Sequence, residues 1–128
     1  MKVKVMVVDD TDHVREMLAN MLELDGFDVV DTAASGPEAI ERVGKASPHV
    51  IILDYKMPGM DGLTTTKHIR AVAPDLPIIL YTAYLDEDLL EKAGRAGVSL
   101  CVGKPEGIAA LERQISALSL ELAEVDIR

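Results

Sequence analysis

The sequence predicts an α/β fold in which a parallel five-stranded sheet carries helices on both faces. Five short apolar runs alternate along the chain with five segments of helical periodicity, an alternation typical of βαβ crossovers. The run at 50–53 is wholly apolar, as expected of a strand buried on both faces of a parallel sheet. Strands are expected at residues 3–8, 27–33, 50–53, 77–81 and 98–102.

The helices between these strands are predicted from apolar residues spaced three or four positions apart. The first begins after Thr11 or Asp10, either of which suits a helix cap, and Gly26 ends it. Ser35 is expected to cap the second helix, and Pro48 to follow its end. The other three helices are expected at about 63–73, at 86–95 and from 106 towards the C-terminus.

The order of the strands follows from their polarity. The strand at 27–33 contains Asp28, Asp31 and Thr32 and is predicted to lie at an edge, whereas the other four are apolar enough to be central. This pattern fits the order 2-1-3-4-5 of a flavodoxin-like doubly wound (βα)5 sandwich. In that order the first and third strands are neighbours, and the switch point between them is where such sheets place their chemistry.

Composition limits the classes of function. A chain of 128 residues fits one domain, and its net charge of −9 argues against direct nucleic-acid binding. The single cysteine cannot form an internal disulfide. The apolar run before Asp9 is too short for a signal peptide or a membrane span, so we expect a cytoplasmic protein without membrane contact.

Charged and polar residues follow the strands at the predicted switch-point edge. Asp9 and Asp10 follow the first strand, Asp54 the third, Thr82 ends the fourth and Lys104 follows the fifth. Alone, each has an ordinary explanation as a helix cap or turn residue. Together, the three carboxylates need a cation to offset their repulsion, and an oxygen-only donor set favours Mg²⁺ or Mn²⁺.

A carboxylate nucleophile, a bound metal, a lysine and a hydroxyl are the groups needed to form and hold an aspartyl phosphate. We therefore expect Asp54 to be the phosphoacceptor.

At this point the chain resembles a response-regulator receiver domain, similar to chemotaxis regulators of two-component signalling. The resemblance covers about residues 2–122. The motifs that carry it are Asp9-Asp10, the loop from Leu53 to Gly62, Thr82-Ala83 and Lys104-Pro105. It implies a switch that accepts a phosphoryl group on Asp54 from a sensor histidine kinase or a phosphotransfer protein, and that catalyses only its own phosphorylation and dephosphorylation.

The resemblance also implies roles for single residues. Asp10, Asp54 and the backbone carbonyl of Lys56 would ligate the metal directly, and Asp9 would act mainly through water. Lys104 would pair with the phosphoryl group, and Thr82 would move to hydrogen-bond it. The Lys104–Pro105 bond is expected to be cis.

The chain departs from the family at one switch position. Cys101 stands three residues before the lysine, where the family usually has an aromatic ring that turns inward as Thr82 moves. Tyr84 is a possible substitute, although its position suits the site entrance. Lys56 and Tyr84 occupy positions that govern water access in the family, with Ala83 and Pro105 as further tuning positions, and a bulky Tyr84 predicts a long-lived phosphorylated state.

Partner surfaces follow from the same resemblance. Kinase recognition is expected at His13, Val14, Met17 and Leu18 and at the loop of Glu106-Gly107. Output is expected from the surface of helix 4, strand 5 and helix 5, which is also a possible homodimer contact.

The last helix has apolar residues at heptad spacing, which either pack on the sheet or pair with a partner. Residues 1–122 are expected to form the receiver domain, with 123–128 as a helix extension or a linker to an absent output domain. The heptad residues are Ile108, Leu111, Ile115, Leu118, Leu122 and Val125.

Three alternatives belong to other classes. A haloacid-dehalogenase-type phosphatase would have a second acid where Lys56 stands. Flavin binding would need a phosphate loop in place of Asp9-Asp10 and more than 3% aromatic residues. A receiver that acts as a constitutive interaction module without phosphorylation is kept open by Cys101.

Overall fold

Five parallel strands form one sheet in the computed structural model, which describes the backbone of residues 2–127 and the side chains of residues 2–119. The order across the sheet is β2-β1-β3-β4-β5, which confirms the predicted fold class. The strands are β1 (Lys4–Val8), β2 (Asp28–Ala33), β3 (Val50–Leu53), β4 (Ile78–Thr82) and β5 (Leu100–Gly103).

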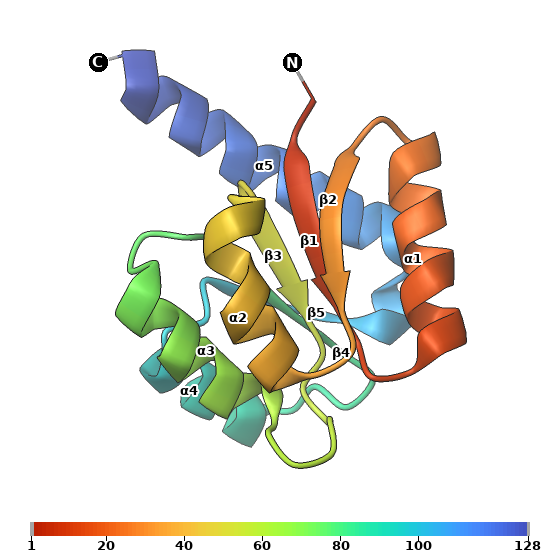
Figure 1. Ribbon diagram of the computed structural model, residues 1–128, viewed down its shortest axis with the longest axis vertical. Coiled ribbons are helices and arrows are strands. Elements are labelled where there is room, and N and C mark those ends of the chain that lie inside the picture. The colour runs from red at the N-terminus through yellow and green to blue at the C-terminus, as the bar shows by residue number, and fades with distance from the viewer. Residues whose placement is uncertain (1, 128) are drawn as a thin grey trace.

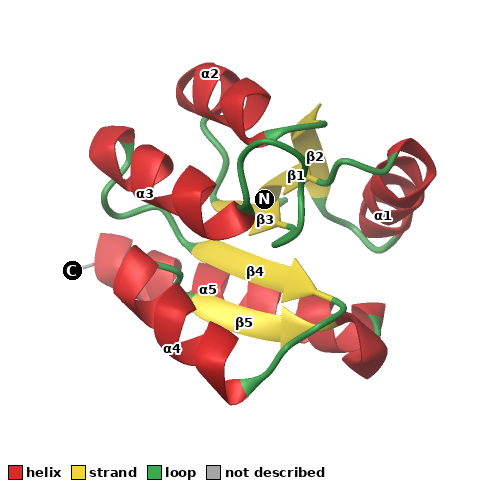
Figure 2. Ribbon diagram, turned by 90° about the horizontal axis from the view of Figure 1, so that it is seen from below, coloured by secondary structure: helices red, strands yellow, loops and turns green. Residues whose placement is uncertain are grey.

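Helices cover both faces of the sheet (Figure 1 and Figure 2). Helices α1 and α5 pack on one face, and α2, α3 and α4 pack on the other. Within the described residues, no helix has both the length and the apolar character needed to cross a membrane. The helices are α1 (Asp12–Leu24), α2 (Gly36–Ala46), α3 (Gly62–Val72), α4 (Glu87–Ala96) and α5 (Ile108–Ile127).

The three central strands supply both hydrophobic cores. Alternate residues of a strand point to opposite faces, so an unbroken apolar run buries side chains on both sides of the sheet. The core on the α2–α3–α4 side takes Met6, Val8, Ile51, Leu53, Ile78 and Leu80. The core on the α1–α5 side takes Val5, Val7, Val50, Ile52 and Ile79.

Polar side chains cap three of the helices. Ser35, Asp61 and Asp86 each accept a hydrogen bond from the backbone N–H three residues further on, at the starts of α2, α3 and α4. Such a bond satisfies one of the donors that a helix start leaves unpaired. Thr11 stands at the cap position of α1, but its side chain makes no capping hydrogen bond.

The last strand and the last helix begin later than the sequence predicts. The N–H of Val98 donates to the carbonyl of Ala93, which closes the end of α4 before the chain joins the sheet at Leu100. Residues Lys104–Glu106 form a short 3₁₀ turn, and α5 starts after it at Ile108.

The expectation of a cis peptide bond before Pro105 is wrong. No cis peptide occurs in the described chain, so the Lys104–Pro105 bond is trans. Pro105 lies in the first turn of the 3₁₀ helix, where its fixed φ fits and its missing N–H leaves no hydrogen bond unmade.

The apolar stripe of α1 is wider than the face that packs on the sheet. Leu18 and Leu22 are buried, but the side chain of Met17 is 55% exposed and that of Met21 36%. Only part of the apolar stripe of α1 is therefore a core face.

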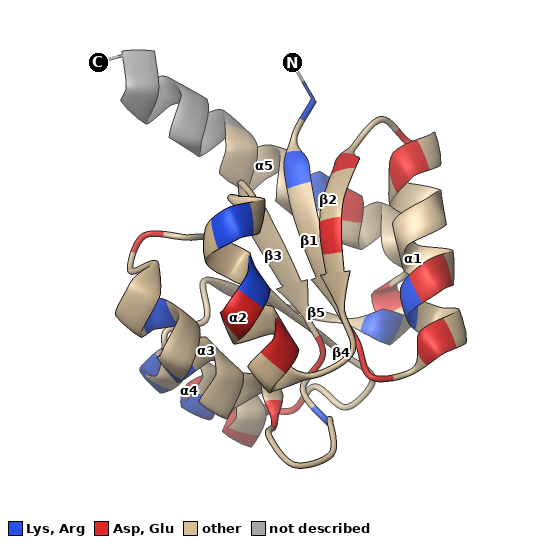
Figure 3. Ribbon diagram, viewed as in Figure 1, with Lys and Arg blue, Asp and Glu red and all other residues tan. Residues whose placement is uncertain are grey.

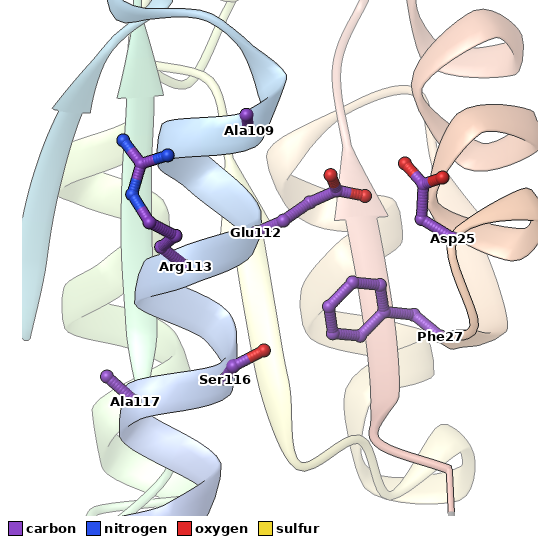
Figure 4. Close-up of a pocket in the computed structure, with 7 residues that line it drawn as sticks. All are labelled: Asp25, Phe27, Ala109, Glu112, Arg113, Ser116 and Ala117. Carbon is purple, nitrogen blue, oxygen red and sulfur yellow. The ribbon is translucent and has the colours of Figure 1, made fainter.

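Helix α5 also lines a cleft against the end of α1, where two carboxyl groups face each other. Figure 4 shows Glu112 and Asp25 directed towards one another beside the ring of Phe27, whereas Arg113 points away from the pair. One carboxyl oxygen of Glu112 is buried without a hydrogen-bond partner. Burial, followed by the facing carboxyl group of Asp25, raises the pKa of Glu112 from 4.5 to about 7.

Replacing Glu112 by glutamine is expected to stabilise the fold in a pH-dependent way. A carboxyl group whose pKa is raised by folding stabilises the fold while protonated and loses that contribution as the pH rises through its folded pKa. The Glu112→Gln variant should therefore melt above the wild type at pH 8, and the difference should shrink by pH 5. Thermal unfolding followed by circular dichroism across this range measures it.

Asp25→Asn should reproduce the effect, because it removes the charge that faces Glu112. Glu16→Gln, at an exposed position of α1, serves as the charge-matched control. A difference between Glu112→Gln and wild type that is the same at both pH values would contradict the prediction.

Candidate functional site

Three carboxylates meet where β1 and β3 end. Val8 pairs with Leu53 in the sheet, so the residues that follow them emerge side by side. Carboxylate oxygens of Asp9, Asp10 and Asp54 lie within 4.8 Å of one another, and Figure 3 shows acidic residues gathered at this edge. The structure therefore brings together the three acids that the sequence places at the switch point.

Lys104 supplies the positive charge of this cluster. Its Nζ donates to Oδ2 of Asp9 at 3.3 Å and lies 3.7 Å from Oδ2 of Asp54. The lysine reaches the acids from the end of β5, as the sequence predicts. One ammonium group thus bridges carboxylates from two strands.

Asp54 is held in an environment that disfavours its negative charge. Burial is the largest cause that raises its pKa above 3.8, and the charges of Asp9 and Asp10 add to it. Lys104 and the N–H of Tyr55, which donates to Oδ1 of Asp54 at 2.8 Å, act in the opposite direction. A bound cation would favour the ionised carboxylate.

Asp9 is the most tightly held of the three acids. Its side chain is buried, and Oδ1 accepts a hydrogen bond from the N–H of Thr11 at 2.9 Å. The guanidinium of Arg15 donates to its backbone carbonyl at 2.8 Å. Because Lys104 bonds the other carboxylate oxygen, Asp9 is fixed on both sides, while Asp10 is only half-buried. Sequence reasoning had assigned no role to Arg15.

The loop between β3 and α3 folds back tightly over Asp54. The N–H of Gly62 donates to the carbonyl of Tyr55 at 2.7 Å. A Cβ atom at Gly62 would lie 2.3 Å from the backbone oxygen of Asp54, so only glycine fits there. This glycine keeps the loop carrying Lys56 against the acidic cluster.

Two side chains meet across the mouth of the site. Nζ of Lys56 lies 4.5 Å from the ring centroid of Tyr84, a cation–π contact between the loops after β3 and β4. The Tyr84 side chain is 67% exposed, which agrees with a place at the entrance.

Thr82 is buried at the end of β4, and its Oγ1 accepts a hydrogen bond from the N–H of Tyr84 at 3.3 Å. The next residue, Ala83, is exposed. Cys101 is half-buried on the α4 side of the sheet, and burial raises the pKa of its thiol.

Only some residues of the predicted partner surface are exposed to solvent. His13 and Met17 are exposed, but Leu18 is 5% exposed and belongs to the core, so assigning it to the partner surface is wrong. Leu18 faces the sheet because it continues the buried stripe of α1 with Leu22. Val14 is half-buried.

The second predicted partner segment lies in the turn before α5. Glu106 is exposed, and its carboxylate accepts a hydrogen bond from the N–H of Gly103 at 2.8 Å. Gly107 takes a φ of +90°, which suits glycine at the start of the helix.

The heptad residues of α5 also divide into buried and partly buried positions. Leu111 and Ile115 are buried on the sheet, and Ile108 and Leu118 pack at its margin. The side chains of Leu122 and Val125 lie outside the described residues.

Comparisons with known proteins agree on one family for this chain. The model of the response regulator receiver domain matches residues 5–116. A protein-glutamate methylesterase/protein-glutamine glutaminase of Methanococcoides burtonii is 37% identical over 123 residues, which cover 94% of this chain and 34% of that protein. The chain thus spans about a third of that relative's length.

Solved structures agree in fold. The chemotaxis protein CheY4 of Vibrio cholerae superposes with a TM-score of 0.85 at 29% identity, covering 92% of this chain and 99% of that one. The CheX–CheY–BeF3–Mg complex of Borrelia burgdorferi gives a TM-score of 0.84 at 26% identity, covering 91% and 88%.

Neutralising Asp54 is expected to stabilise the metal-free protein. Asp54→Asn removes a charge that burial and two neighbouring acids disfavour, so its melting temperature at pH 7 should exceed the wild type's by a few degrees. Because the pKa of Asp54 is raised, the gain should fade as the pH drops and the wild-type carboxyl becomes protonated. Calorimetry in EDTA at several pH values measures it.

Glu41→Gln, at an exposed position of α2, removes the same charge away from the cluster and should leave the melting temperature nearly unchanged. An Asp54→Asn variant that melts below the wild type at pH 7 would contradict the prediction.

Proposed function

Because this chain belongs to the response regulator receiver family, we propose that it is a phosphorylation-activated switch that accepts a phosphoryl group on Asp54. The observation that carries the proposal is the convergence of Asp9, Asp10 and Asp54 within 4.8 Å around a single lysine. An acidic cluster of this kind would hold Mg²⁺ or Mn²⁺ through Asp10, Asp54 and the carbonyl of Lys56, with Asp9 acting through water.

The donor is a phosphohistidine of a sensor histidine kinase or of a phosphotransfer protein. A carboxylate oxygen of Asp54 attacks the phosphorus, the P–N bond breaks, and its electron pair returns to the imidazole nitrogen. Lys104 already lies 3.7 Å from Asp54 and pairs with the phosphoryl oxygens. The metal, when bound, neutralises part of the phosphoryl charge. The chain turns over no separate substrate.

Switching follows from the change of charge at Asp54. The hydroxyl of Thr82 now accepts from the Tyr84 N–H, and it turns towards the phosphoryl group to donate a hydrogen bond. The loop that contains Ala83 and Tyr84 moves with it and alters the surface of α4, β5 and α5. That surface controls a partner, a second copy of the chain or an output domain.

We assign the switch to residues 1–122, with 123–128 as an extension of α5 or a linker. We place the protein in the cytoplasm, away from membranes, and without direct contact to nucleic acid. Docking of the kinase uses His13, Val14 and Met17 with the Glu106-Gly107 turn.

A second function is favoured by Cys101. A half-buried thiol stands where the family usually has an aromatic ring, so the usual ring movement is not available. A receiver that binds its partner constitutively, without phosphorylation, would need no such ring.

Intact mass after incubation with acetyl phosphate and Mg²⁺ distinguishes the two functions. The switch predicts a gain of one phosphoryl group that does not form when EDTA is present during the incubation or in Asp54→Asn, because the metal and the carboxylate are both required. Size-exclusion chromatography of the same samples tests whether phosphorylation changes assembly.

Glu41→Gln should take up the phosphoryl group like the wild type, since it leaves the site intact. A wild-type protein that never gains mass would favour the constitutive interaction module instead.

The phosphorylated state is expected to be long-lived because Tyr84 and Lys56 cover the mouth of the site. Tyr84→Ala removes a cation–π contact worth about 0.5–1 kcal/mol, so phosphate release should become about two- to fivefold faster. Tyr84→Phe keeps the ring and should match the wild type in a phosphate-release assay. Dephosphorylation of the wild type within seconds would contradict this prediction.

A further inference from the structure

Tyr81, the residue before Thr82, lies between the acidic site and α5. It is half-buried near the end of β4 and pairs with Val102 of β5. Its ring packs on the core of the α1–α5 side, against which Ile108 of the first turn of α5 also packs. One side of the ring therefore belongs to the hydrophobic core that holds α5.

The ring of Tyr81 also lies near Lys104. The Nζ atom of Lys104 lies 5.9 Å from the ring centroid of Tyr81, within cation–π range. The same Nζ atom lies 3.3 Å from Asp9 and 3.7 Å from Asp54. A single ammonium group is thus shared between the ring and the two carboxylates.

The hydroxyl of Tyr81 also responds to the charges of the turn that leads into α5. Burial is the largest cause that raises its pKa, the charge of Lys104 opposes the rise, and that of Glu106 adds to it. Glu106 in turn binds the N–H of Gly103. Tyr81 therefore lies among the charged groups of the turn between β5 and α5.

Strand alternation separates Tyr81 from the position where the family places its aromatic ring. Leu80 pairs with Cys101, and both pack on the α4 side of the sheet, whereas Tyr81 packs on the α5 side. The other two tyrosines are Tyr55, packed on the α4 side, and Tyr84, which is exposed against Lys56. Among the described tyrosines, Tyr81 alone contacts Lys104 and the α5-side core together.

We propose that Tyr81 is the positioning residue that couples Lys104 to α5, so that this chain transmits its switch along the α5 face of the sheet. When Lys104 is drawn towards a phosphoryl group on Asp54, its ammonium leaves the ring. Tyr81 then repacks against the first turn of α5. The trigger rests on the proposed function, whereas the contact between Tyr81 and Lys104 does not.

Fluorine NMR of the protein labelled with 3-fluorotyrosine tests both parts. The chain has three tyrosines, so Tyr→Phe variants assign the three resonances. Lys104→Met should shift the Tyr81 resonance in the unphosphorylated protein and leave that of Tyr55 in place. Acetyl phosphate with Mg²⁺ should shift the Tyr81 resonance of the wild type to the extent that intact mass reports the adduct.

The relay itself is tested by methyl NMR of Ile108, Leu111 and Ile115 on α5. Tyr81→Leu should take up the phosphoryl group and largely lose the phosphorylation-dependent shifts of these methyls. Tyr81→Phe, which keeps the ring, should restore them. A merely structural role would alter the methyl spectrum equally with and without the adduct.

The outcomes separate the two hypotheses. An adduct that leaves the Tyr81 resonance unmoved, or equal methyl responses in Tyr81→Leu and wild type, would overturn the relay and leave the proposed function standing. Failure to form the adduct would overturn the proposed function, and the Lys104→Met comparison would still decide the contact. No shift of Tyr81 in Lys104→Met overturns the relay in either case.

Discussion

The constraint on which the site depends is the crowding of three carboxylates beside one ammonium group. Asp9, Asp10 and Asp54 repel one another at this distance, and Lys104 offsets part of that repulsion. The backbone fixes their positions, since the registered pairing of β1 with β3 and the close approach of Gly62 leave little freedom. An added cation or phosphoryl group would therefore change the balance of charge at the site.

The charge cluster lies at the edge of a sheet that carries helices on both faces, so a change at the cluster can be transmitted along either face. On the α4 side lies Cys101, a small side chain at the position where the family usually has an aromatic ring. On the α5 side, the proposed path leads from Lys104 to Tyr81, which packs on the same core as Ile108. Leu80 and Tyr81 are adjacent in β4 and point to opposite faces of the sheet. The position of an aromatic residue in the strand therefore decides on which face it lies.

Most of the fold and the acidic cluster could be predicted from the sequence because they follow from periodicity and strand ends. The strand order depends on which runs are apolar, and the convergence of Asp9, Asp54 and Lys104 depends on parallel strands ending at one edge. Sequence patterns could not decide details that depend on packing between elements. They placed Leu18 on the partner surface although it is buried, because the spacing of apolar residues in a helix does not show which of them touch the sheet.

Sequence patterns also could not predict which residues distant in sequence lie close together, and two such arrangements involve α5. Asp25 faces Glu112 across the cleft beside α5, and Tyr81 packs on the same core as Ile108, which precedes Glu112 by about one helical turn. Since a helix moves as a unit over so short a distance, a displacement of its first turn changes the separation of the two carboxyl groups. The proposed relay from Asp54 and the protonation of the cleft carboxyl groups would therefore act on the same helix, α5.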